Sequence, residues 1–293
     1  MQVIRAKVLG FCMGVRRAVE LACLQTGPDA GDVFTLGPLI HNPQTLADLK
    51  SRGVEILDEN CLPEKLNNVS VIIRAHGVAP QVEAALRQRG AVIIDATCPR
   101  VKASQVKAKT LAESGFRLFL AGEACHAEIA GIRGYAAAAP FCAVVGNAAE
   151  AEAAAAALYA ESSGGKTALV GQTTISAEEY SAVGEAIQKY FPKLEIIQTI
   201  CAAATDRQES LRELLDTVDA VIIAGGRASA NTRRLETIAG KSGKPCVLVE
   251  DAAGIPQTFF SFRKIGLCAG ASTPDSVIDA IEQRLAGSQG GAG

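Results

Sequence analysis

Short aliphatic runs alternate along this chain with longer segments of helical pattern. Many of the runs end in Gly or small polar residues, and they cover 3–10, 33–37, 69–74, 91–95, 117–121, 141–145, 167–170, 194–199, 220–224, 246–250 and 264–268. Strands that alternate with helices are typical of βαβ units, in which a parallel sheet is covered by helices. The pattern therefore predicts an α/β protein.

The composition favours several small cores of this kind. Hydrophobic residues make up 48% of the 293 residues but aromatic residues only 4%, so Val, Ile, Leu and Ala have to build the interior. A chain of this length is long for one core. We expect three similar α/β lobes with parallel-type sheets in a pseudo-threefold, or trefoil, arrangement. They cover 1–98, whose N-terminal strand could pack with the third lobe, 99–198 and 199–285, and a disordered Gly-rich tail follows over 286–293.

Charge and hydropathy argue against two classes of partner. The net charge is −2 and no long basic run occurs, which argues against nucleic acid. No apolar stretch approaches the ~20 residues of a membrane span. The sequence enters an apolar run directly after its first residues, so we expect no targeting segment and a cytoplasmic location. In a reducing compartment, nine cysteines favour metal or redox use over a disulfide framework.

Three of the cysteines share one sequence context. Cys12, Cys98 and Cys201 each stand where an apolar run ends and a helical pattern begins, and they are separated by 86 and 103 residues. Three thiolates suit a four-iron cluster with one iron left open, so we expect them to hold a central iron–sulfur cluster. Zinc is the rival metal, but the chain has no C-x₂₋₄-C pair, which disfavours a structural zinc site.

The other cysteines do not match this context. Cys23, Cys142 and Cys246 lie in apolar patterns and are interpreted as small hydrophobic residues, while Cys61 has no evident role. The remaining two, Cys125 and Cys268, are expected in loops that also carry polar site candidates, and their roles stay open.

Polar residues gather where the apolar runs end. The three histidines of the chain, His41, His76 and His126, all stand there, and ligands of open α/β sheets bind beyond the carboxyl ends of strands. Similar loops supply Thr173, Thr174, Ser229, Asn231, Ser272 and Thr273. Such neutral donors suit an anion such as a phosphate. Glu128 is either a proton donor in this anion site or an ordinary residue of a first helical turn.

Eight motifs resemble one known family. They are G-F-C-M-G-V at 10–15, L-I-H-N at 39–42, R-A-H-G-V at 74–78, D-A-T-C-P at 95–99, G-Q-T-T at 171–174, C-A-A-A-T-D-R-Q at 201–208, S-A-N-T at 229–232 and A-G-A-S-T-P at 269–274. In this order they are similar to the 4-hydroxy-3-methylbut-2-enyl diphosphate reductases, the IspH or LytB family, over nearly the whole chain.

The resemblance implies a fold, a cofactor and a reaction. It implies three α/β lobes around a 4Fe-4S cluster held by Cys12, Cys98 and Cys201, and reductive removal of the hydroxyl of an allylic diphosphate at the end of the non-mevalonate isoprenoid pathway. It also implies reduced ferredoxin or flavodoxin as electron donor. By similarity, the diphosphate would be held by His41, His76, His126, Ser229, Asn231 and Ser272. Glu128 and Thr173 would deliver protons to the reacting hydroxyl, with Thr173 in contact with substrate.

Three positions depart from the family pattern. The family usually has H-P-E where this chain has Ala127, and S-S-N where it has Ala230; Cys268 stands where a hydroxyl residue is common. These departures leave open a related iron–sulfur reductase or dehydratase that acts on another phosphorylated substrate. Two further alternatives are a non-catalytic iron–sulfur sensor and a plain sugar-phosphate-binding α/β protein.

Overall fold

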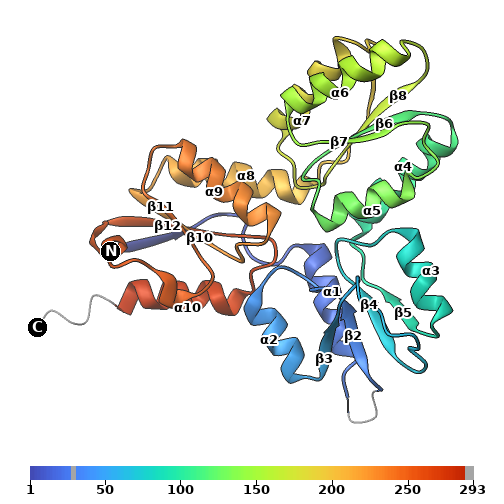
Figure 1. Cartoon of the computed structure of the whole chain (residues 1–293). Helices are drawn as coiled ribbons and strands as arrows, with labels where there is room; N and C mark the ends of the chain where they lie inside the picture. The colour runs from blue at the N-terminus through green and yellow to red at the C-terminus, as the bar shows by residue number, and fades with distance from the viewer. Residues whose placement is uncertain (28–30, 288–293) are drawn as a thin grey trace, which may run out of the picture. The chain divides into compact units, whose positions relative to one another are not determined.

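The computed structural model describes residues 1–27 and 31–287, which contain three four-stranded sheets (Figure 1). Every strand pairing in the three sheets is parallel, so the prediction of three α/β lobes with parallel sheets is confirmed. The chain forms two compact units. Unit 1 comprises Met1–Arg16, Ile40–Ser51 and Ala202–Gly293, and unit 2 comprises Arg17–Leu39 and Arg52–Cys201.

The first sheet of unit 2 has the order β3-β2-β4-β5. Its strands are β2 (Val33–Leu36), β3 (Val54–Leu57), β4 (Ser70–Ile73) and β5 (Val92–Asp95). The helices nearest in sequence are α1 (Met13–Leu24), α2 (Pro43–Ser51, in unit 1) and α3 (Pro80–Gln88). Strand β3 was not predicted, because it is a short edge strand whose two central residues are exposed, so its sequence lacks an apolar run.

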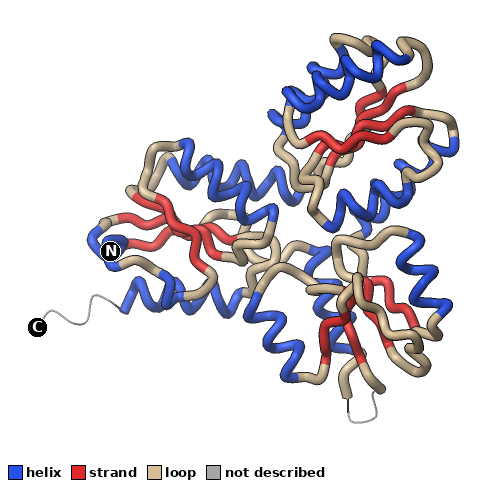
Figure 2. The backbone as a smooth tube through the Cα atoms, in the orientation of Figure 1, coloured by secondary structure: helices blue, strands red, loops and turns tan. Residues whose placement is uncertain are grey.

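The second sheet of unit 2 has the order β7-β6-β8-β9 and is covered on both faces (Figure 2). Its strands are β6 (Arg117–Ala121), β7 (Cys142–Val145), β8 (Thr167–Gly171) and β9 (Glu195–Ile196). Successive side chains of a strand point to opposite faces. Phe119 accordingly packs in a core with α6 (Ala148–Glu161) and α7 (Ala177–Gln188), whereas Leu118 and Leu120 pack in one with α4 (Pro99–Glu113) and α5 (Ala127–Tyr135).

The sheet of unit 1 combines the two ends of the chain in the order β1-β12-β10-β11. Its strands are β1 (Gln2–Arg5), β10 (Ala220–Ala224), β11 (Cys246–Val249) and β12 (Lys264–Ala269). One face packs against α8 (Ala202–Leu215) and α9 (Ala230–Lys241) and the other against α10 (Asp275–Gly287), with short 3₁₀ turns at Ala252–Gly254 and Gln257–Ser261.

Some expected boundaries differ from the structure. The runs 3–10 and 194–199 are strands only over Gln2–Arg5 and Glu195–Ile196. The expected tail began at Ala286, but α10 continues to Gly287, and the rest of that tail, 288–293, lies outside the described residues. None of the helices in the described parts of the chain is long and apolar enough to cross a bilayer.

All three sheets share one strand order. If the strands of each lobe are counted along the chain, with β1 counted as the last strand of its sheet, each sheet has the order second, first, third, fourth. The fourth strand lies at an edge, and in each sheet it is followed by one of the three cysteines: β1 by Cys12, β5 by Cys98 and β9 by Cys201. The site residues therefore recur at matching places.

Candidate functional site

Each of the three cysteines is held by its own sheet through the same hydrogen bond. The backbone N–H of Cys12 donates to the carbonyl of Ala271 (3.1 Å), that of Cys98 to Ala75 (2.9 Å) and that of Cys201 to Thr173 (2.9 Å). Each acceptor stands two residues beyond the end of the third strand of its sheet. Each cysteine also directly precedes a helix, as the sequence predicts. The same strand order and the same backbone hydrogen bond thus place one cysteine at the start of a helix for each of the three sheets.

The polar candidates also occupy matching positions. His41, His126 and Ser229 each stand five residues after the end of the first strand of a sheet. His76, Thr174 and Ser272 each stand three residues after the end of the third strand. The carboxyl ends of parallel strands share one edge of a sheet, where ligands bind in α/β proteins. In each sheet, the neutral hydrogen-bond donors and the cysteine therefore stand beyond the carboxyl ends of the strands.

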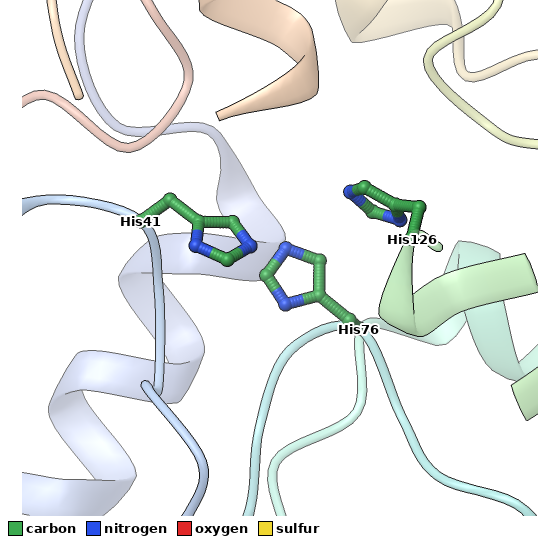
Figure 3. A group of neighbouring side chains, drawn as sticks. All are labelled: His41, His76 and His126. Atoms are coloured by element: carbon green, nitrogen blue, oxygen red, sulfur yellow. The ribbon is translucent and has the colours of Figure 1, made fainter. Parts of the chain in front are cut away.

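His126 caps the helix that carries Glu128. Its Nδ1 accepts a hydrogen bond from the backbone N–H of Glu128 at 3.2 Å, and the side chain is buried. A ring that accepts at Nδ1 carries its proton on Nε2 when neutral, so that nitrogen is a donor. His76 packs edge-to-face against His126, with ring centroids 5.3 Å apart (Figure 3). His41, drawn in the same figure, belongs to unit 1.

Glu128 is buried and bound twice by Thr173. Oε1 of Glu128 accepts from the backbone N–H of Thr173 at 2.6 Å, and Oε2 lies 3.0 Å from the Thr173 hydroxyl. Burial raises the pKa of Glu128 to about 7, although both hydrogen bonds from Thr173 act to lower it. A carboxyl with this pKa is protonated in much of the population near neutrality and can donate a proton.

Gln172 fastens the Thr173 loop to the loop that leads to Glu128. Its Oε1 accepts from the backbone N–H of Glu123 at 3.0 Å, and its Nε2 donates to the hydroxyl of Thr174 at 3.0 Å. The side chain is buried. Sequence reasoning missed this role, although Gln172 stands in the G-Q-T-T motif, because its partner at Glu123 is known only when β6 and β8 are neighbours.

In unit 1 the loops after β10 and β12 carry the remaining polar candidates. Ser229 caps α9 by accepting from the N–H of Thr232, and the Ser272 hydroxyl donates to the backbone carbonyl of His41 at 3.3 Å. A Cβ on Gly226 would collide with that same carbonyl, so only glycine permits this approach.

Asn231 is the unsatisfied polar side chain of this group. It is 5% exposed, and neither its amide oxygen nor its amide nitrogen has a hydrogen-bond partner among residues 1–27 and 31–287. A buried amide without partners costs free energy unless something else bonds to it. The amide therefore lacks a protein partner within the described residues and is available to water or to a bound polar ligand.

The three cysteines fit an iron–sulfur cluster by their chemistry. All three are partly exposed, and no disulfide joins any of the nine cysteines, which all lie in the described residues. Soft thiolates are the usual ligands of such clusters. Near Cys12, the buried Arg207 donates to the carbonyl of Gly10 at 2.8 Å and so fixes the turn before the cysteine.

Cys268 does not lie in a site loop. It stands in β12, is fully buried in the core beside α8 and α9, and burial raises the pKa of its thiol to about 12. The expectation of a loop position was wrong because β12 extends through Cys268 to Ala269. Cys125, by contrast, is exposed in the loop before His126.

The sheets and these loops define a class: α/β proteins with three parallel sheets, each presenting a cysteine and neutral hydrogen-bonding side chains. The model of the LytB protein family matches residues 3–286, and the chain belongs to that family. Two relatives named 4-hydroxy-3-methylbut-2-enyl diphosphate reductase come from Treponema denticola (46% identical, 97% of this chain, 99% of the relative) and Aquifex aeolicus (39%, 97% and 95%).

Solved structures of enzymes with related names share the fold. One, described as (E)-4-hydroxy-3-methyl-but-2-enyl diphosphate reductase, the terminal enzyme of the non-mevalonate pathway, is 37% identical, with a TM-score of 0.70 over 98% of this chain and all of that one. The E-1-hydroxy-2-methyl-but-2-enyl-4-diphosphate reductase of Plasmodium falciparum is 26% identical, with a TM-score of 0.83 over 95% of this chain and 86% of that one.

Proposed function

We propose that this chain is a 4-hydroxy-3-methylbut-2-enyl diphosphate reductase. It would remove the allylic hydroxyl of its substrate to give isopentenyl and dimethylallyl diphosphate, the last step of the non-mevalonate isoprenoid pathway. The observation that carries the proposal is the buried Glu128–Thr173 pair, because Thr173 also accepts the hydrogen bond of Cys201. A proton donor and a predicted cluster ligand are thus fixed by one residue.

Cys12, Cys98 and Cys201 would hold a 4Fe-4S cluster. When bound, such a cluster supplies electrons one at a time to the substrate. The three equivalent backbone hydrogen bonds support this role, because they hold each cysteine before a helix in the same way. A reducing compartment suits both the cluster and the nine cysteines, and we place the enzyme in the cytoplasm.

The diphosphate would be bound by neutral donors. They are His41, His76, His126, Ser229, Asn231 and Ser272. The orphaned amide of Asn231 and the Nε2 donor of His126 support this assignment. Neutral donors bind an anion and orient it without a permanent counter-charge, so these residues contribute position rather than bond breaking.

Glu128 would give the proton that lets the hydroxyl leave as water, and Thr173 would hold that carboxyl in place. The overall reaction consumes two electrons and two protons, with one proton leaving in water and one entering the product. The electrons would come singly from a reduced ferredoxin or flavodoxin.

Anaerobic purification with iron and sulfide analysis tests the proposal, followed by turnover of the allylic diphosphate with reduced methyl viologen. We expect about four iron and four sulfide per chain, and both isoprenyl diphosphates as products. Cys98→Ser should lose most of the iron, while the core substitution Cys268→Ser serves as its matched control. A colourless protein that does not reduce the substrate would refute the function.

A further inference from the structure

A groove of about 630 Å³ lies beside the loop that carries Cys98, on the surface of unit 2. It is lined by Arg17, Asp95, Thr97, Pro99, Lys102, Ala103, Val106, Lys107 and Thr110. Thr97 and Pro99 are the two chain neighbours of Cys98, so anything seated in the groove touches the segment that presents this cysteine. A second hollow of about 490 Å³, along α5, has no lining residue adjacent to Cys12, Cys98 or Cys201.

The loop that carries Cys98 is held by side chains of α1 and α4, and both helices contribute residues to the groove lining. Arg17 of α1 donates to the carbonyls of Thr97 and Asp95, each at 3.2 Å. The Asp95 carboxylate accepts from the backbone N–H of Thr97 at 3.0 Å and from Lys102 of α4 at 3.1 Å. These interactions therefore fix the conformation of the loop beside the groove.

The groove is lined by exposed apolar side chains and by basic ones. Val106 is 50% exposed and lies with Ala103 and Pro99 in the lining. Three cations, Arg17, Lys102 and Lys107, line it with a single carboxylate, Asp95. Helix α4 as a whole carries four basic residues and one acidic residue, although the chain has a net charge of −2. Lys107 does pair with Glu195 at 3.5 Å, but exposed pairs of this kind are weak and exchange readily.

We propose that this groove is the docking site of a small acidic one-electron carrier protein, which passes electrons towards Cys98. The inference rests on the proposed function, since only a reductase of this kind needs such a partner. A surface that combines exposed apolar side chains with basic ones suits a transient complex with an acidic redox partner, because such interfaces are small and their association is steered by charge. Electron transfer weakens steeply with distance, so docking beside a ligand of the cluster favours the reaction.

Charge reversal at Lys107, with Lys109 as control, tests the proposal. Lys107→Glu places a carboxylate in the groove, whereas Lys109→Glu makes the same change on the same helix outside the lining. Turnover of the allylic diphosphate by the cluster-containing enzyme is measured with reduced acidic flavodoxin. It is measured separately with reduced methyl viologen, a small reductant that needs no protein interface. Binding of oxidised flavodoxin is measured by calorimetry at low salt, without turnover.

We expect Lys107→Glu to raise the KM for flavodoxin and its Kd about tenfold, one charge contact being lost and one repulsion gained. Viologen-driven turnover should stay unchanged, and Lys109→Glu should match the wild type. Equal flavodoxin binding by both variants would overturn the docking site. A wild type that binds flavodoxin but does not reduce the allylic diphosphate with viologen would instead overturn the proposed function.

Discussion

The backbone N–H of Cys201 donates a hydrogen bond of 2.9 Å to the carbonyl of Thr173. The N–H and hydroxyl of the same threonine hold the buried carboxyl of Glu128. One residue thus joins a predicted cluster ligand to the predicted proton donor, so the two are positioned together. The equivalent bonds at Ala75 and Ala271 join the other two cysteines to loops that carry His76 and Ser272.

Glu128→Gln should retain the fold and substrate binding but lower kcat about 100-fold or more, because an amide cannot supply the proton. The amide oxygen of Gln can still accept from the Thr173 N–H, so the loop should stay in place. Steady-state turnover with reduced methyl viologen measures the effect. The cluster absorbance and the substrate Kd are the controls, and turnover near the wild-type rate would remove Glu128 from the mechanism.

As the pH rises from about 4.5 to about 7, the free energy of unfolding should fall because of the titration of Glu128. The pKa of this carboxyl is raised from 4.5 to about 7 by burial, so in this range the folded state binds more protons than the unfolded state. The loss is about 3 kcal/mol at most and is complete above about pH 7. Denaturant unfolding at several pH values should show it in the wild type and not in Glu128→Gln; identical pH profiles would contradict it.

Thr173→Val should move the alkaline limb of the pH–rate profile to higher pH. The hydroxyl of Thr173 acts to lower the pKa of Glu128, so its loss raises that pKa further. Turnover that needs protonated Glu128 should fall above about pH 7 in the wild type and at a higher pH in the variant. Thr173→Ser keeps the hydroxyl and should behave as the wild type, and an unmoved limb in Thr173→Val would count against this coupling.

Ala127→Pro should stabilise the protein by about 0.5 kcal/mol without loss of turnover. Ala127 is the first residue of α5, where proline fits, and the preceding His126 has φ −77° and ψ 135°, which a following proline favours. Thermal unfolding at one cluster loading measures the effect. The mid-helix change Ala130→Pro is the control and should destabilise. A lower melting temperature for Ala127→Pro would show that the first turn of α5 differs from this geometry.

Ala230→Ser should lower the KM for the allylic diphosphate. Ala230 stands between Ser229 and Asn231 and is 7% exposed, so a hydroxyl there would add a neutral donor beside two predicted diphosphate ligands. A hydrogen bond to a charged group is worth about 1.5–3 kcal/mol, which sets a gain of about tenfold or more. Ala228→Ser, two residues earlier, is the control. A KM that does not change would mean that residue 230 does not face the substrate.

Local sequence predicted every strand of the described residues except β3, and also the helices that begin directly after the three cysteines. The eleven expected runs contain or overlap strands at 2–5, 33–36, 70–73, 92–95, 117–121, 142–145, 167–171, 195–196, 220–224, 246–249 and 264–269. Aliphatic runs bury both faces of a parallel strand, so they are visible without tertiary information. The family was also identifiable, because its motifs are short runs of adjacent residues at strand ends and helix starts.

The tertiary structure alone decided what the loops do together. Glu128 and Thr173 are 45 residues apart and meet only because β6 and β8 pair side by side. The sequence left Glu128 open between a proton donor and a first-turn helix residue, and its burial in α5 accounts for the raised pKa. Likewise, β1 joins β12 across the length of the chain. The sequence only left this pairing open, because pairing between parallel strands leaves no local signal. Local sequence patterns specified the strands and helices. Long-range packing decided which residues at the strand ends meet, and so which chemistry they can carry out.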